Sequence, residues 1–134
     1  MTNLKPSSGF LRQTRILLSI KPRHANQIFI GEKKYEFRRT IFSRKVDVVL
    51  LYVSTPIRRV VAEFDVVEVI SEPLDTLWKR TRKYAGISED YFYDYFSGLI
   101  KGHAIKIGEI RFYDEPFCPK KELGLKPPQS FAYC

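Results

Sequence analysis

The sequence of 134 residues predicts an α+β fold, with a mixed or antiparallel sheet that forms a small closed or half-closed barrel. Three observations lead to this class. Segments with strand patterning outnumber those with helical periodicity, and short links join most successive strand segments. A chain of this length suits a single domain, and its aromatic content of 14% supplies a core that needs no disulfides.

The first segments set the limits of the expected domain. Residues 1–14 are polar and predict a flexible lead-in, which leaves 15–134 as one domain. The apolar run ILLSI at 16–20 is typical of a buried strand. A helix is expected next, from Pro22, which suits a first helical turn, to Gly31, which suits a C-terminal cap.

Three strands are predicted in the middle of the chain. KKYEFRR at 33–39 alternates with a period of two, which separates its side chains onto two faces: Tyr35 and Phe37 on one, Lys34, Glu36 and Arg38 on the other. VDVVLLYV at 46–53 is almost continuously apolar, as in a strand buried on both faces. RRVVAEFDVVEVI at 58–70 alternates again, and we expect it to pair with 46–53 as a long antiparallel hairpin.

Two helices and two strands are expected to follow. Ser71 can cap a helix that runs to about Tyr84, and Ser88 can cap a second helix whose first turn is acidic. The last elements are two short strands and a mostly irregular, proline-containing tail, at 103–107, 109–113 and from Asp114 onward.

The positive charge of the chain is concentrated in its first third. Residues 1–45 contain eleven Lys/Arg and two Asp/Glu, a balance of +9, whereas residues 46–134 contain twelve and thirteen, a balance of −1. This asymmetry indicates an anionic partner, with nucleic acid as the leading candidate. The alternative is a basic surface that serves only solubility.

Cysteine usage and hydropathy predict a cytoplasmic protein. Cys118 and Cys134 have neither a metal-ligand spacing nor a disulfide framework, which predicts two free thiols in a reducing compartment. No apolar run has the length of a membrane span, and the N-terminus lacks the pattern of a signal peptide. No Asp/Glu cluster suggests a metal site, so we expect no metal and no cofactor.

The run from Leu18 to Arg38, LSIKPRHANQIFIGEKKYEFR, resembles the ASCH (activating signal cointegrator homology) domain. The signature of that family is G-x-K-x-x-E-x-R after a strand and a helix, and the matching positions are Gly31, Lys33, Glu36 and Arg38. YVSTP and the closing PPQSFAY resemble the bacterial and phage-borne branch, so that the resemblance spans about residues 16–134.

The resemblance implies a PUA-like β-barrel with about three helices and a cleft beside the motif strand. Proteins with PUA-like folds commonly bind RNA or modified bases. Some ASCH-like proteins are similar to small amidohydrolases that act on acylated cytidine, and others are ribonucleases. The family name also suggests a third class, a protein-interaction adaptor.

The motif residues have a physical interpretation of their own. Glu36 and Arg38 are two positions apart on a strand and therefore project from one face, where an acceptor and a forked donor suit a nucleobase edge or a phosphate. Lys33 faces the opposite side of a regular strand and joins them only if the strand begins at Lys34 or bulges. The alternative is that Glu36 and Arg38 form an exposed ion pair that contributes little to stability.

We therefore predict a module that binds RNA or a nucleotide-like ligand in a basic cleft. The side chains expected to contact the ligand are Lys21, Lys33, Glu36, Arg38, Arg39, Ser54 and Arg58. No membrane partner is expected, and the sequence leaves the oligomeric state open.

The alternative prediction is a small metal-independent hydrolase, either a ribonuclease or an amidohydrolase on a modified nucleoside. Lys33 would be the base or charge stabiliser and Glu36 the acid/base. Amidohydrolase-like relatives have a nucleophilic threonine where this chain has Glu36, which weighs against the same mechanism. Ser54 and Ser130 are interpreted as turn residues.

Two further features have a bearing on the site. His24 is interpreted as a solvated helix residue. Tyr52, Lys21 and Lys33 are candidates for charge stabilisation in a metal-free cleavage. The aromatic run YFYDYF at 91–96 suits either a stacking platform for bases or core packing. Its helical spacing favours core packing of Phe92, Tyr95 and Phe96, which leaves Tyr91 outside the apolar face.

Overall fold

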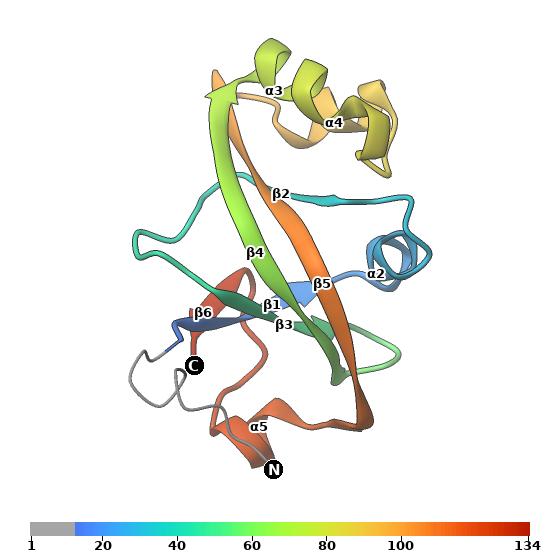
Figure 1. Cartoon of the computed structure of the whole chain (residues 1–134), viewed down its shortest axis with the longest axis vertical. Helices are drawn as coiled ribbons and strands as arrows, with labels where there is room; N and C mark the ends of the chain where they lie inside the picture. The colour runs from blue at the N-terminus through green and yellow to red at the C-terminus, as the bar shows by residue number, and fades with distance from the viewer. Residues whose placement is uncertain (1–12) are drawn as a thin grey trace.

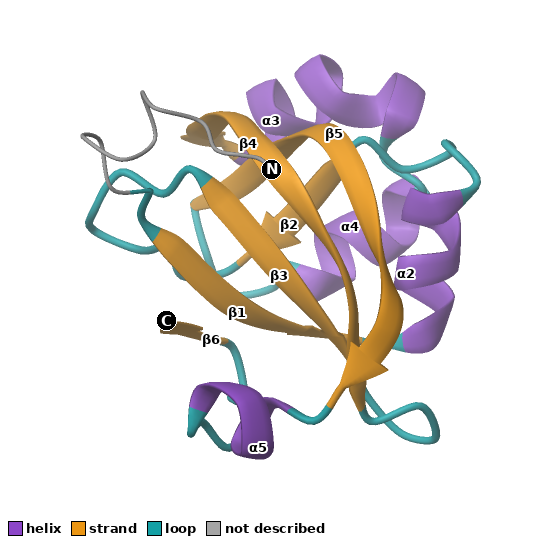
Figure 2. Ribbon diagram, turned by 60° about the horizontal axis from the view of Figure 1, so that its bottom comes forward, coloured by secondary structure: helices purple, strands orange, loops and turns teal. Residues whose placement is uncertain are grey.

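A computed structural model describes residues 13–134, so the lead-in predicted for 1–14 lies outside the described residues except for its last two. The chain forms a mixed sheet of six strands in the order β2-β5-β4-β3-β1-β6, which curls into a half-barrel (Figures 1 and 2). Neighbours β1 and β3 are parallel and all other pairs are antiparallel. The strands are β1 (Arg15–Ile20), β2 (Tyr35–Arg38), β3 (Val48–Val53), β4 (Arg59–Pro73), β5 (Lys101–Phe117) and β6 (Phe131–Tyr133). The predicted α+β class and curled sheet are confirmed.

Three helix ends lie where the sequence predicts them: the start and the end of α2 and the start of α4. Helix α2 begins at Pro22, and Gly31 turns the chain after it with a φ of +85°. The hydroxyl of Ser88 accepts a hydrogen bond from the backbone of Tyr91 (3.1 Å) and so caps α4. The helices are α2 (Pro22–Phe29), α3 (Leu74–Thr81), the short 3₁₀-helix η1 (Arg82–Tyr84), α4 (Glu89–Tyr95) and α5 (Pro119–Leu123).

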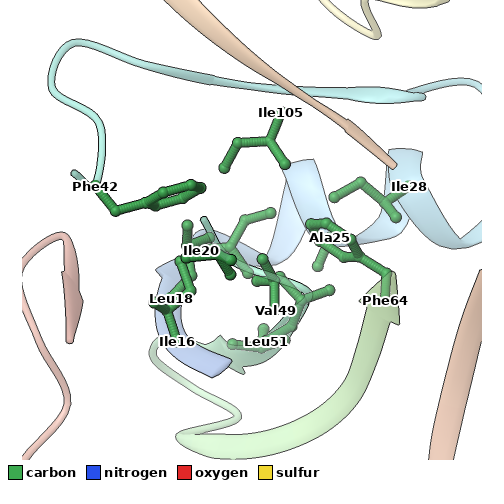
Figure 3. Packing of buried hydrophobic residues seen from close by; sticks show 12 residues of the cluster. Ile16, Leu18, Ile20, Ala25, Ile28, Phe42, Val49, Leu51, Phe64 and Ile105 are labelled. Carbon is green, nitrogen blue, oxygen red and sulfur yellow. The ribbon is translucent and has the colours of Figure 1, made fainter. Parts of the chain in front are cut away.

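Strands β1 and β3 are buried on both faces, as predicted for 46–53. The inner face of the half-barrel carries one core, which α2 covers with Ala25 and Ile28 (Figure 3). The outer face carries a second core against the end of β5 and the residues around α5. Burying a leucine or isoleucine at such a position contributes about 1.5–3 kcal/mol, so this pair of strands anchors one side of the cavity described below.

A third core joins helices α3 and α4 to β2. Phe92 and Phe96 are fully buried and pack edge-to-face on Phe37, with ring centroids 5.3 and 6.2 Å apart. The predicted core packing of Phe92 and Phe96 is therefore confirmed. Because α4 is held by this face, Tyr91 lies on its other side, toward α2.

The predicted hairpin of 46–53 with 58–70 is confirmed, but the helix boundary at Ser71 is wrong. Strand β4 continues to Pro73, which pairs with Lys101 of β5, and α3 begins only at Leu74. The long antiparallel ladder between β4 and β5 (Figure 1) supplies backbone hydrogen bonds that a local cap at Ser71 cannot match.

The two short strands predicted at 103–107 and 109–113 form one strand, β5. The break expected at Gly108 is a register shift, since Ile107 pairs with Val66 and Ile110 with Phe64. A Cβ atom at Gly108 would lie 3.0 Å from the carbonyl oxygen of Asp65, so the close approach of the backbones favours glycine there.

The tail from Asp114 is also more regular than predicted. Strand β5 extends to Phe117, α5 follows, and β6 pairs with β1 across Leu17 and Ala132. Helix α5 raises the number of α-helices in the described part of the chain to four, against about three expected. Pro116 lies within β5 and Pro119 is the first residue of α5, so these prolines do not prevent regular structure.

Candidate nucleic-acid interface

A cavity of about 420 Å³ opens between the end of β1, helix α2, strand β2 and helix α4. Helices α2 and α4 lie on the same side of the sheet (Figures 1 and 2). Five of the predicted site residues line this cavity: Lys21, Lys33, Glu36, Arg38 and Ser54. Several other lining residues had no functional role in the sequence-based prediction, among them His24, Tyr91, Tyr95 and Gln129.

Glu36 and Arg38 project from one face of β2 into the cavity, as their spacing predicts. A guanidinium nitrogen of Arg38 lies 3.2 Å from the carboxylate of Glu36, and the two side chains are only 13% (Arg38) and 8% (Glu36) exposed. The alternative of an exposed surface ion pair is therefore wrong. The second terminal nitrogen of Arg38 donates to the hydroxyl of Ser130 (2.7 Å), which fixes the plane of the guanidinium.

Lys33 reaches the same cavity because β2 begins only at Tyr35. The turn after α2 places it: its backbone N–H donates to the carbonyl of Gln27 (3.0 Å). Its ammonium group donates to the carbonyl of Ala85 (3.1 Å), across a bridge between the two backbones. The condition under which Lys33 joins Glu36, a strand that begins after it, is thus met.

The environment of Lys33 disfavours its positive charge. The residue is 3% exposed, and within residues 13–134 its ammonium group has no ion-pair partner. Burial lowers the pKa of Lys33, and the charge of Glu36 opposes that shift in part. A buried lysine of this kind gains from an anionic ligand, and it releases a proton more readily than an exposed lysine.

His24 is half-buried at the cavity, so its interpretation as a solvated helix residue is wrong. Its Nε2 atom lies 3.1 Å from the hydroxyl of Tyr91. Burial first, and then the charges of Lys33, Arg23 and Lys21, lower the pKa of His24 to about 4. It is therefore neutral at pH 7. One signal was present in the sequence, since His24 lies one helical turn before the buried Ile28.

The C-terminal segment closes one side of the cavity. The backbone N–H of Ser19 donates to the carbonyl of Ser130 (3.2 Å), and the hydroxyl of Ser19 donates to the carbonyl of Pro128. Gln129 lies between these contacts and lines the cavity. Ser130, which the sequence suggested as a turn residue, lies in this segment, and its hydroxyl accepts the hydrogen bond from Arg38.

The remaining candidates lie away from the cavity. Arg39 is exposed and donates to the carbonyls of Tyr95 (2.7 Å) and Ser97 (3.0 Å), so that it fastens β2 to α4. Arg58 is exposed on the turn between β3 and β4, with a φ of +53°. Tyr52 is buried in the core on the outer face of the sheet.

Gly86 is expected to be essential for the position of Lys33. It has a φ of +70°, and a Cβ atom there would lie 2.5 Å from the Cβ of Lys33. We expect Gly86→Ala to lower the free energy of unfolding by about 2–4 kcal/mol, from the left-handed backbone and the clash together. Chemical denaturation with urea measures this.

Gly124→Ala is the matched control for that substitution. Gly124 has a φ of +69°, but a Cβ atom added there would meet nothing within 4 Å, so only the backbone cost of about 1–2 kcal/mol applies. If the two variants lose equal amounts of unfolding free energy, the contact between residue 86 and Lys33 contributes nothing to the cost of Gly86→Ala.

Residues 13–134 contain no group of three His, Cys, Asp or Glu side chains that could hold a metal ion. None of their helices is both long enough and apolar enough to cross a bilayer. Cys118 and Cys134 are both free thiols.

Comparison with known proteins identifies a matching domain family and several similar proteins. The model of the ASCH domain matches residues 18–100. An ASCH domain-containing ribonuclease of Zymomonas mobilis is 27% identical over 121 residues, which cover 87% of this chain and 82% of that protein. A relative named ATP synthase subunit alpha, from Ureaplasma parvum, is 30% identical over 88% of this chain, but the chain spans only 15% of its length.

Solved structures agree with the fold. The crystal structure of ASCH from Zymomonas mobilis superposes with a TM-score of 0.80 at 26% identity, covering 90% of this chain and 87% of that one. The predicted PUA-like fold is confirmed by this likeness, since the match includes the curled mixed sheet and its helices.

Proposed function

Because this chain belongs to the ASCH domain family, we propose that its cavity beside β2 binds a nucleotide of single-stranded RNA. One observation carries the proposal: the shielded Glu36–Arg38 pair faces a cavity of about 420 Å³. A carboxylate beside a guanidinium offers an acceptor and two donors, which suit a base edge and a phosphate. The volume lies in the range of small-ligand sites.

The charges of the cavity support an anionic ligand. Lys21, Lys33 and Arg38 face a single carboxylate, that of Glu36. The hydrogen bond between Tyr91 and the neutral His24 adds an aromatic wall without adding a charge. A phosphate would therefore gain ion pairs with groups that already lie in place, which reduces the entropy that binding costs. A cytoplasmic location, expected from the free thiols, is part of this proposal.

Cleavage of the bound RNA is a second candidate function. The lowered pKa of Lys33 favours it, as does the similarity to the Zymomonas mobilis ribonuclease. The neutral amine of Lys33 would accept the proton of a 2′-hydroxyl while the O2′–P bond forms and the P–O5′ bond breaks. The resulting ammonium would return that proton to the leaving 5′-oxygen, and Arg38 would stabilise the negative charge on the non-bridging phosphate oxygens.

The geometry gives less support to an amidohydrolase. That chemistry needs a hydroxyl activated by a base. Ser19 donates its hydroxyl to the carbonyl of Pro128, and the hydroxyl of Ser130 accepts from Arg38. In the described part of the chain, neither hydroxyl is hydrogen-bonded to Lys33 or His24.

Fluorescence anisotropy with a labelled single-stranded RNA tests the binding. We expect the affinity to fall as salt is added, because phosphate contacts release counterions. Lys33→Met should weaken binding by about tenfold or more, as removal of a buried charge contact does. Lys79→Met, on the exposed face of α3, should not. An RNA affinity that changes neither with added salt nor with Lys33→Met would contradict the proposal.

Gel analysis of the same RNA after incubation tests the cleavage. Products that end in a 2′,3′-cyclic phosphate are expected from the wild type and not from Lys33→Met. Intact RNA with the wild type at pH 7–9 would remove the ribonuclease and leave the binding proposal standing.

A further inference from the structure

We propose that a smaller hollow next to the cavity is a second nucleotide subsite, in which Arg23 binds the phosphate that links two nucleotides and Tyr91 contacts the second base. This inference rests on the proposed function, because it extends the same RNA beyond the main cavity.

The second hollow adjoins the first directly. It has a volume of about 240 Å³ and lies between α2 and the segment that leads into α4. His24, Ile87 and Tyr91 line both hollows, so these three side chains form the ridge between them. A chain whose first nucleotide fills the cavity would therefore pass over this ridge into the second hollow.

The ridge is held in place by contacts between its own side chains. The hydroxyl of Tyr91 lies 3.1 Å from Nε2 of His24, and the two rings meet edge-to-face with centroids 5.6 Å apart. These contacts fix a half-buried aromatic ring between the two hollows. Aromatic rings in such positions bind bases with little preference for sequence.

Arg23 provides a positive charge that is positioned but unused. Its guanidinium lies 5.0 Å from the centroid of the Tyr91 ring, and the side chain is exposed. No carboxylate pairs with Arg23 within residues 13–134. A cation–π contact of this kind orients the guanidinium and leaves its N–H groups free for a phosphate.

The other lining groups indicate both the ligand and the length of the track. Gln27 and Ser88 offer neutral donors and acceptors for a base edge in the second hollow. Beyond Tyr91, a third hollow carries the carboxylates of Asp90 and Asp94. These would repel a further phosphate, so we expect the track to end after the second nucleotide.

Calorimetric titration with short 2′-O-methyl oligouridylates tests this inference. Their 2′-oxygen cannot attack the phosphate, so these probes resist cleavage during the titration. The mono-, di- and trinucleotide should all carry a 3′-phosphate. For the wild type we expect the dinucleotide to bind about tenfold more tightly than the mononucleotide, and the trinucleotide less than about twofold more tightly than the dinucleotide.

Two variants and one control locate the gain. Arg23→Gln should remove most of the gain from mono- to dinucleotide while leaving mononucleotide binding within about twofold, because Arg23 lines only the second hollow. Tyr91→Ala should also remove most of that gain, and it should weaken mononucleotide binding as well, because Tyr91 lines both hollows. Arg82→Gln removes the same charge from an exposed position that lines neither hollow, and it should keep the full gain.

The outcomes separate this inference from the proposed function. A wild type that binds no mononucleotide overturns the proposed function and the second subsite with it. Mononucleotide binding without a gain for the dinucleotide, or a full gain in Arg23→Gln, overturns the second subsite alone.

Discussion

Replacing Lys33 by methionine is expected to raise the melting temperature at pH 7 while it weakens RNA binding. The ammonium group is buried without an ion-pair partner among the described residues, and it donates to the carbonyl of Ala85. Methionine keeps the aliphatic volume but removes the buried charge. We expect a gain of about 1–3 kcal/mol in the free energy of unfolding, even after the loss of that hydrogen bond.

The gain should depend on pH in a definite direction. Burial lowers the pKa of Lys33 below its ordinary value of 10.5, so the unfolded chain binds more protons between the lowered pKa and 10.5. Stability of the wild type therefore rises with pH across that window. The advantage of Lys33→Met is complete below the lowered pKa and shrinks as the pH approaches 10.5.

Thermal unfolding of both proteins from pH 7 to pH 10 measures this dependence. Lys79→Met serves as the control, because Lys79 is exposed on α3 and its replacement should change stability little at any of these pH values. A Lys33→Met protein that is less stable than the wild type at pH 7 would contradict the argument, since its buried charge would then be stabilised by the site.

Glu36→Gln is expected to have the second large effect, in the opposite direction on stability. The amide keeps the shape of the side chain, but Arg38 and Lys33 lose the one carboxylate in the cavity. We expect the free energy of unfolding to fall by about 2–4 kcal/mol, close to the cost of breaking other buried ion pairs. The pKa of Lys33 should fall further, because the charge of Glu36 is what raises it.

Urea denaturation measures the loss, and the pH profile of any Lys33-dependent cleavage should move to lower pH. Glu63→Gln is the matched control on β4: Glu63 pairs with Arg111 at 2.8 Å, outside the cavity. Loss of the Glu63 carboxylate in this variant should leave RNA binding unchanged. If Glu36→Gln alters stability by less than about 0.5 kcal/mol, the pair contributes nothing measurable to the fold.

The local sequence was sufficient for the elements that depend on periodicity and caps. Alternation along KKYEFRR placed Glu36 and Arg38 on one face, and the structure pairs them at 3.2 Å. Continuous apolarity at 46–53 predicted burial on both faces, and Gly31 and Ser88 marked helix ends. These features are encoded within a few residues, because backbone geometry alone determines which side chains share a face.

The charged residues of the motif line one cavity, but the motif did not predict the other residues of its lining. Whether Lys33 joins the cavity depended on where β2 begins. That start depends on backbone hydrogen bonds to Gln27 and Tyr84. Arg39 and Arg58 had the right charge, yet they lie outside the cavity. Charge is readable from the sequence, whereas the direction of a side chain relative to a distant wall is not.

Only the tertiary structure joined the remaining parts of the cavity. His24 meets Tyr91 across 67 positions, and Arg38 meets Ser130 across 92. The β4–β5 ladder likewise overrode a plausible cap at Ser71. Such contacts are decided by which surfaces the packed core brings together, and a linear pattern carries no record of that. The sequence by itself therefore determined the strand, the charged face and the family, and folding alone determined the cavity that they enclose.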